Sequence, residues 1–177
     1  MRLIRKYLHD DAKELANKSI FERTAARAIV IDGEDILLLY TKRYDDYSFP
    51  GGGVDPGEDI TMGMIRELEE ETGAKNIEVI AEFGIYEEIK PFWKKEYELI
   101  HMTSHFYICD IHKELGATNL EDYEIKNGMD AKWVNIYEAI NHNRAVIEAQ
   151  PESIGIYIDR ELYMLEVVAK ELVEKSI

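Results

Sequence analysis

The chain has 177 residues, of which 36 are acidic and 21 are lysine or arginine, so its formal net charge at pH 7 is −15. Hydrophobic residues make up 46% and charged residues 32%, which is typical of a folded domain and argues against intrinsic disorder. A surface this negative repels polyanions, and no apolar run is long enough to cross a bilayer. We therefore expect neither a nucleic-acid polymer nor a membrane as a partner.

The length and the cysteine content limit the number of domains and the cellular compartments that we expect. The chain fits one domain over residues 1–177 with a sizeable core. Its one cysteine, Cys109, excludes an internal disulfide, which favours a reducing, cytoplasmic compartment. Because Cys109 lies in an apolar run, we expect a buried small hydrophobe there and not a nucleophile.

The N-terminal part of the chain predicts a short helix followed by a hairpin. Residues 1–20 form an N-terminal extension in which mixed helical periodicity predicts a helix from Tyr7 to Lys18. A strand is expected over Thr24–Ile31, then a turn at Asp32-Gly33 and a returning strand over Ile36–Thr41.

A glycine-rich loop then leads into a second helix. The loop runs from Tyr44 to Glu58 and is followed by Asp59, which is a suitable cap for a helix that continues to about Thr72. Gly73 stands where a left-handed residue would end that helix.

The second half of the chain predicts two long strands, a short strand and two helices. The strands are expected over Ile77–Ile89, Leu99–Ile111 and Lys132–Val134, and the helices over Ile136–Asn141 and from about residue 159 to 176. Hairpins mixed with helices favour an α/β fold in which a mixed sheet lies between helices. In the last helix the residues that recur at helical spacing, and so should pack on the core, are Leu162, Leu165, Val168 (or Ala169) and Leu172.

Three carboxylates share one face of the helix that begins after Asp59. Glu67, Glu70 and Glu71 are spaced i, i+3 and i+4, and the neighbouring face carries apolar residues suited to the core. Like charges this close repel one another, and a hard divalent cation such as Mg²⁺ or Mn²⁺ would remove the repulsion. A solvated acidic helix face is the alternative interpretation of the same spacing.

The loop before this helix favours the first interpretation. Its three consecutive glycines permit tight turns without side chains, and a second turn at Pro56-Gly57 delivers Glu58 to the helix entrance. Backbone N–H groups near a helix N-terminus suit anionic ligands. A missing side chain at Gly63, on the carboxylate side of the helix, would let a ligand or metal approach closely.

The segment from Gly52 to Ala74 resembles the Nudix box. Eight fixed positions of that motif match in register: Gly52, Glu58, Arg66, Glu67, Leu68, Glu70, Glu71 and Gly73. The resemblance implies a Nudix-like α/β/α sandwich and a metal-dependent, MutT-like pyrophosphohydrolase that acts on a small nucleotide-like substrate, either a nucleoside diphosphate linked to another moiety or a nucleoside triphosphate. A non-catalytic Nudix-like module that binds a nucleotide or ADP-ribose is the alternative, and a homodimer is a further expectation.

The resemblance also implies roles for the matched residues. Glu70 and Glu71 would be the main ligands of Mg²⁺ (or Mn²⁺), and Glu67 would be a ligand or the general base. Arg66 would orient Glu67 through a charge-assisted hydrogen bond. Glu58 would support the metal, and the carbonyl of Gly51 or Gly52 would complete its coordination.

Outside the box, further residues are candidates for metal or substrate contacts. An additional acidic ligand or base is expected before the late strand, with Glu124 favoured over Glu121 and Asp130. Arg27 is expected to meet a phosphate or to point into water. Tyr47 and Phe49, like Tyr44, are expected to wall a nucleobase pocket by stacking.

Overall fold

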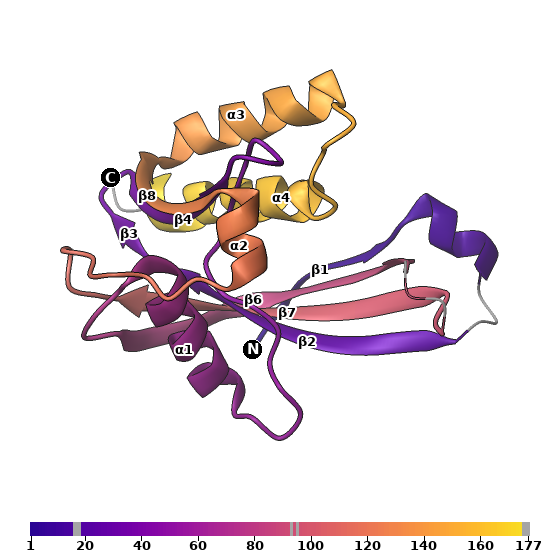
Figure 1. The fold of residues 1–177 in the computed structure, drawn as a ribbon, viewed down its shortest axis with the longest axis horizontal. Coiled ribbons are helices and arrows are strands. Elements are labelled where there is room, and N and C mark those ends of the chain that lie inside the picture. The colour runs from indigo at the N-terminus through magenta and orange to yellow at the C-terminus, as the bar shows by residue number, and fades with distance from the viewer. Residues whose placement is uncertain (16–18, 93, 95, 175–177) are drawn as a thin grey trace.

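The computed structural model describes residues 1–15, 19–92, 94 and 96–174, and within them the strands form two four-stranded sheets (Figure 1). Helix α1 lies on one side of the sheets, and helices α3 and α4 lie on the other. The predicted α/β fold with a mixed sheet covered by helices is confirmed, with the addition that the strands divide into a larger and a smaller sheet.

The larger sheet is mixed and has the strand order β1-β6-β7-β2. Strands β6 and β7 pair antiparallel, whereas β1 runs parallel to β6 and β2 runs parallel to β7. Figure 1 shows that these strands extend beyond the helices on one side of the molecule. The bounds are Leu3–Leu8 for β1, Ile20–Ile29 for β2, Glu78–Pro91 for β6 and Leu99–Asp110 for β7.

The prediction of an N-terminal helix over Tyr7–Lys18, which the periodicity suggested, is wrong. Leu3–Leu8 forms a strand instead, and only Asp10–Leu15 forms a 3₁₀ helix, while residues 16–18 lie outside the described part. The physical reason is tertiary, because the edge of β6 offers unpaired backbone groups that the N-terminal segment satisfies.

The smaller sheet is centred on β4, which spans Asp35–Thr41. Strand β8 (Met129–Asn135) pairs along one edge of β4, and β3 (Ile31–Asp32) and β5 (Asp46–Ser48) pair along the other. The β3–β4 turn contains Gly33 at φ +66, as the Asp32-Gly33 pair predicts.

Helix α1 (Ile60–Thr72) has the predicted ends. The Asp59 carboxylate accepts hydrogen bonds from the N–H groups of Thr61 and Met62, which satisfies two donors that the first turn leaves free. Gly73 closes the helix at φ +69, and its N–H donates to the Glu69 carbonyl. Both ends of the carboxylate-bearing helix are therefore fixed by local sequence.

The other helices are longer or additional. Helix α2 (Asp122–Asn127) was not expected, and α3 (Ile136–Ala149) continues beyond the predicted Asn141. Helix α4 (Ile158–Val168) continues as a π-helical turn over Ala169–Val173, and residues 175 and 176 of the predicted helix lie outside the described part. None of the described helices is long and apolar enough to span a membrane.

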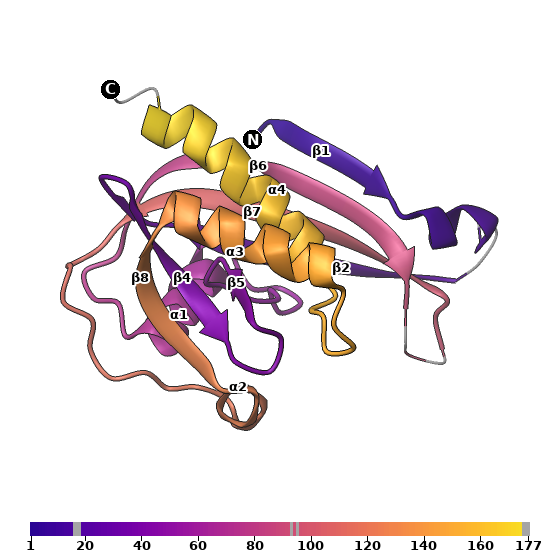
Figure 2. The ribbon, with the colours of Figure 1, turned by 90° about the horizontal axis from the view of Figure 1, so that it is seen from above.

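Two apolar clusters hold the layers together. On the α1 side, Met64 and Leu68 are fully buried against β2 and against Leu37 of β4. On the other side, α3 and α4 lie side by side over the sheets (Figure 2) and bury residues such as Leu165 and Val168. Burial of one such side chain contributes about 1.5–3 kcal/mol. Because α1 docks through its apolar face, its carboxylate face is left free for the site.

Candidate active site

A pocket of about 690 Å³ is lined by residues of both sheets, of α1 and of the loop before α4. Its size is in the range of small-molecule sites, which measure about 300–1,000 Å³. One part of its wall is formed by Gly51 and by the box residues Gly52, Gly53, Asp55, Arg66, Glu67 and Glu71.

Arg66 is the centre of a cluster of box carboxylates. Its Nε donates to Glu58 Oε1 at 3.1 Å, and its Nη1 donates to Glu67 Oε1 at 2.8 Å and to Glu70 Oε2 at 3.3 Å. The contact with Glu67 is the one that the resemblance predicts. The same guanidinium thus contacts three of the four glutamates at the fixed positions of the box.

Two glycines of the box make room for these carboxylates. A Cβ on Gly63 would stand 2.9 Å from Glu58 Oε2, and one on Gly52 would stand 2.7 Å from the Glu67 Cδ. The expectation that Gly63 opens the helix to a ligand is therefore corrected, because the Glu58 carboxylate fills that space.

Glu71 points away from this cluster into the protein. Its side chain is buried, and its Oε2 accepts a hydrogen bond of 2.6 Å from the Gly51 N–H. Burial raises the pKa of Glu71 to about 8, while Arg27 and the Gly51 N–H oppose that rise. Burial also raises the pKa of Glu67. Both carboxyl groups therefore hold a proton more readily than in water, because the protein compensates their negative charge only in part.

Arg27 points into the site and not into water. Its Nη1 donates to the carbonyls of Phe49 and Gly51, and its side chain lines the pocket. Strand β2 also holds the loop through its backbone, because Ala26 N donates to Gly52 O at 3.0 Å and Ala28 N donates to Pro50 O at 2.9 Å.

Gly51 is the residue that this close approach requires. Its φ of +126 is unfavourable for residues with a side chain, and a Cβ there would clash with the Ala26 carbonyl oxygen. The glycine run thus lets the loop lie directly against β2.

Glu124, the candidate for an additional acidic ligand or base, lines the pocket. It is buried at the first turn of α2, where its Oε2 accepts from the Glu121 N–H at 2.7 Å and its Oε1 accepts from the Tyr123 hydroxyl at 3.1 Å. Its charge raises the pKa of both Glu67 and Glu71, which places it electrostatically close to the box. Glu121 also lines the pocket, whereas Asp130 is exposed and is absent from the lining.

Of the three aromatic residues predicted to wall the pocket, Tyr44 lines it, whereas Phe49 and Tyr47 lie elsewhere. The Phe49 ring is fully buried and packs edge-on against Phe106, so that prediction is wrong. The Tyr47 ring packs against Tyr40 and His142, outside the pocket lining, because alternate side chains of β5 face opposite sides of the sheet. The aromatic residues that do line the pocket are Tyr44, Tyr123 and Tyr157.

Sequence reasoning missed a buried ion network beside the pocket. Glu161 Oε2 accepts from the Phe49 N–H at 2.9 Å, and its Oε1 accepts from Arg160 Nη2 at 2.6 Å. Arg160 Nη1 also donates to Glu88 Oε1 at 2.9 Å. The signal was helical spacing, because Glu161 falls on the same face as Leu165 and Val168, where a charged residue requires a buried partner.

The donor set suits a hard divalent cation, although it is not preassembled. Among the described residues, no three histidine, cysteine or acidic side chains converge as a ready metal site. The reason is visible in the contacts, since Arg66 stands between Glu58, Glu67 and Glu70. Carboxylate and carbonyl oxygens are the ligands that Mg²⁺ and Mn²⁺ prefer, and the carboxylates here outnumber the cations that contact them.

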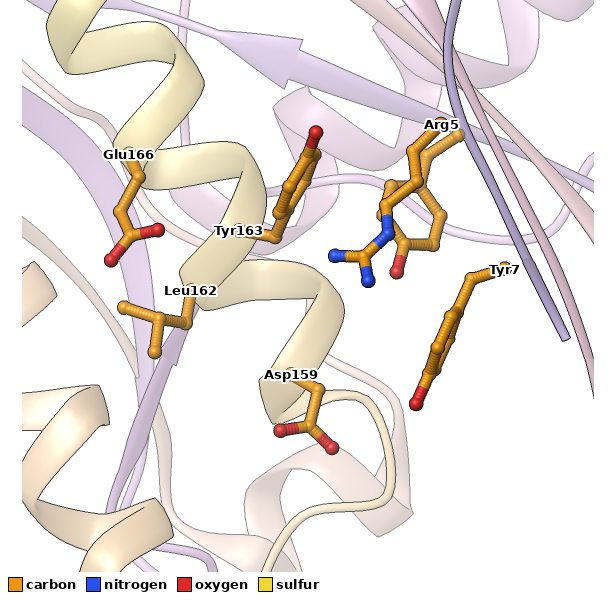
Figure 3. Close-up of a pocket in the computed structure, with 7 residues that line it drawn as sticks. Arg5, Tyr7, Asp159, Leu162, Tyr163 and Glu166 are labelled. Carbon is orange, nitrogen blue, oxygen red and sulfur yellow. The ribbon is translucent and has the colours of Figure 1, made fainter. Parts of the chain in front are cut away.

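A second cavity, of about 280 Å³, lies between β1 and α4 and contains no box residue (Figure 3). The Arg5 guanidinium lies over the rings of Tyr7 and Tyr163, at 4.7 and 4.4 Å from their centroids. These cation–π contacts attach the N-terminal strand to the last helix.

In this α/β domain an acidic helix therefore lies behind a glycine loop, at the wall of a pocket in the size range of small-molecule sites. A family profile described as NUDIX domain matches residues 22–153, and the chain belongs to this family.

Similar proteins share the family and the fold. The chain is 30% identical over 132 residues to an RNA pyrophosphohydrolase of Campylobacter jejuni, an alignment that covers 68% of this chain and 83% of that protein. It is 37% identical over 73 residues to an RNA pyrophosphohydrolase of Nitratiruptor sp., covering 40% of this chain but only 47% of that relative. The fold is similar to that of a Nudix hydrolase from Nitrosomonas europaea, with a TM-score of 0.56, 17% identity and coverage of 85% and 91%.

Proposed function

We propose that the protein is a metal-dependent pyrophosphohydrolase that cleaves a phosphoanhydride in a nucleoside triphosphate or in a nucleoside diphosphate linked to another moiety. The observation that carries the proposal is the arrangement of the box, in which Arg66 gathers Glu58, Glu67 and Glu70 beside a nucleotide-sized pocket. Acidic residues spaced only for a solvated helix face would need neither the buried Glu71 nor glycines that make room for carboxylates.

The residues that would hold Mg²⁺ (or Mn²⁺) are Glu70 and Glu71, supported by Glu58 and the Gly52 carbonyl. When bound, the metal neutralises phosphate charge and makes a water molecule more acidic. Glu67 serves as a ligand or as the base that accepts the proton of the attacking water, and Arg66 holds it in place by the 2.8 Å hydrogen bond.

Residues outside the box complete the proposed site. Glu124 is buried at the pocket and is available as a further ligand or base. Arg27 keeps the Gly51 carbonyl in place and offers its charge to a phosphate. Tyr44, Tyr123 and Tyr157, and not Tyr47 or Phe49, are the rings available to a base.

The 5′ end of an RNA is a second candidate substrate, because the relatives in Campylobacter and Nitratiruptor are named RNA pyrophosphohydrolase. A net charge of −15 opposes extended contact with a polyanion, so only the terminal nucleotide would enter the pocket.

We further propose a cytoplasmic location, in line with the single buried cysteine, and a homodimer that light scattering would test.

The test is a turnover screen with Mg²⁺ or Mn²⁺ over nucleoside triphosphates, ADP-ribose, nucleotide sugars, dinucleoside polyphosphates, NADH and an RNA with a 5′-triphosphate. We expect turnover of one class and its loss, by about 10²-fold or more, in Glu70→Gln. Glu69→Gln is the matched control, since Glu69 is exposed on the same helix. Equal turnover by Glu70→Gln and wild type, or metal-dependent ligand binding without any product, would overturn the proposal in favour of a binding module.

A further inference from the structure

The part of the pocket formed by the smaller sheet has a chemistry unlike that of the box. The cross-strand pairs Thr41–Asp46 and Leu39–Ser48 of β4 and β5 all face the pocket. Hydroxyl, carboxyl and apolar groups therefore alternate on a flat sheet surface. No phosphate-binding cation comes from these strands, since their pocket-facing residues are neutral or acidic.

Asp46 is the residue of this surface whose buried carboxyl group has few hydrogen-bond donors within the protein. Its side chain is only 8% exposed, and among the described residues the hydrogen bond to its carboxyl group comes from its own backbone N–H. Its neighbour Asp45, in contrast, is exposed and accepts from the Tyr40 hydroxyl at 2.6 Å. A buried carboxyl group can accept more hydrogen bonds than this one, and leaving that capacity unused is costly, so its position at a pocket indicates that a ligand supplies further donors.

The loop before α4 is shaped around this carboxyl group. Gly155 lines the pocket directly beside it, and a Cβ on Gly155 would collide with Asp46 Oδ2. The missing side chain leaves the carboxyl group room at the pocket surface. Burial and the nearby Glu161 raise the pKa of Asp46 to about 7, against the opposing effects of His142 and of the backbone N–H of Asp46.

The neighbouring groups restrict the partner to a flat molecule that carries N–H donors. Tyr44 and Met129 line the same pocket and offer apolar surface to a ring, while a carboxyl group accepts two adjacent N–H groups side by side. Among nucleobases, guanine presents a ring N–H next to an exocyclic amine, whereas adenine presents an acceptor beside its amine.

We propose that Asp46 is a specificity-determining residue that accepts hydrogen bonds from the N–H edge of a guanine-type base. The inference rests on the proposed function only in placing a nucleotide in this pocket. The phosphates lie toward Arg27 and the box glutamates, and the base lies against β4 and β5. Asp46 touches the base and takes no part in the cleavage.

The test measures binding of GMP, IMP and AMP to the wild-type protein by calorimetry in Mg²⁺, because none of these ligands contains a phosphoanhydride that turnover would consume. We expect GMP to bind about 10-fold or more tighter than AMP, with IMP between them because it lacks the exocyclic amine. Asp46→Asn should bring the dissociation constants of GMP and AMP to within about threefold of each other, because an amide offers one acceptor and one donor in place of two acceptors.

Asp45→Asn is the matched control and should leave the GMP preference unchanged, since Asp45 lies outside the pocket lining. Gly155→Ala is a second disrupting variant and should weaken the preference as Asp46→Asn does, with melting curves showing that both proteins are folded. Equal affinity of the wild type for GMP and AMP, undetectable GMP binding in the millimolar range, or an unchanged preference in folded Asp46→Asn would overturn the inference. A GMP preference without hydrolysis of any nucleotide would support the role of Asp46 and reject the proposed hydrolase activity. Hydrolysis without a base preference would support the hydrolase activity and reject the role of Asp46.

Discussion

Two groups of charged side chains meet at the pocket, and they differ in how their charges balance. The box cluster consists of Glu58, Arg66, Glu67 and Glu70 with the buried Glu71 behind them, and these four carboxyl groups outnumber the two cations that act on them, Arg66 and Arg27. The back cluster consists of Glu88, Lys90, Arg160 and Glu161, in which two carboxylates face two cations. The charges of the back cluster balance within the protein, whereas the box cluster has carboxyl groups in excess, and we propose that a divalent cation balances them.

The two clusters share one segment, the loop from Phe49 to Gly51. Glu161 of the back cluster accepts the Phe49 N–H, and Glu71 of the box cluster accepts the Gly51 N–H. The Phe49 end of the loop is thus held by the charge-balanced back cluster, and the Gly51 end is held by Glu71 of the box cluster, where carboxyl groups are in excess. The comparison teaches that burial alone does not mark a functional residue, since Arg160 is among the most buried side chains of the protein.

The largest expected effect on stability is that of Arg160→Met. The change leaves Glu88 and Glu161 buried without their cation, which should cost about 3–5 kcal/mol of unfolding free energy. Urea denaturation measures it. Arg66→Met is the counterpart in the box cluster, where a side chain 38% exposed should contribute about 1 kcal/mol or less to stability. If Arg66→Met destabilises the fold more than Arg160→Met does, the contrast between the clusters is mistaken.

Gly51→Ala should have the next largest effect. A Cβ in the φ +126 conformation collides with the Ala26 carbonyl, so we expect a loss of about 2–4 kcal/mol together with displacement of the loop. Gly33→Ala is the control, because φ there is +66 with nothing within 4 Å, and it should cost about 1–2 kcal/mol. Equal thermal midpoints for the two variants would show that the loop is not held against β2.

A smaller, pH-dependent effect is expected at Asp46, which faces Glu161, Asp45 and His142. The folded-state pKa of about 7 lies above the ordinary 3.8, so the folded protein binds the extra proton between these values. The contribution to stability is then fully present below about pH 4 and is lost as pH rises to 7, on the order of 1–3 kcal/mol. Asp46→Asn should therefore match the wild type near pH 4 and exceed its stability at pH 8. A stability difference that does not change with pH would contradict this.

Signals from neighbouring residues in the sequence were enough to predict helix α1, which carries the box carboxylates. Asp59 and Gly73 bound α1 as predicted, because capping depends on adjacent residues alone. The shared face of Glu67 and Glu70 likewise follows from helical spacing. The reach of Arg66 to Glu67 was implied by the resemblance to the Nudix box, and the contacts agree with it.

Sequence patterns did not predict the features that depend on contacts between residues far apart in the chain. The N-terminal segment became a strand because β6 lies beside it, and Phe49 turned into the core because Phe106 receives it. Neither partner lies nearby in the chain. Asp46 is separated from Gly155 and Glu161 by more than half of the sequence, so its burial could not be anticipated from neighbouring residues.

Binding of Mn²⁺ followed by electron paramagnetic resonance tests the central claim most directly, since it asks whether the unbalanced cluster takes up a cation independently of any substrate. We expect the wild type to bind Mn²⁺, Glu71→Gln to weaken binding by about 10-fold or more, and Glu161→Gln to leave it unchanged. Binding that is equal in Glu71→Gln and the wild type, or that depends on Glu161 instead, would contradict it.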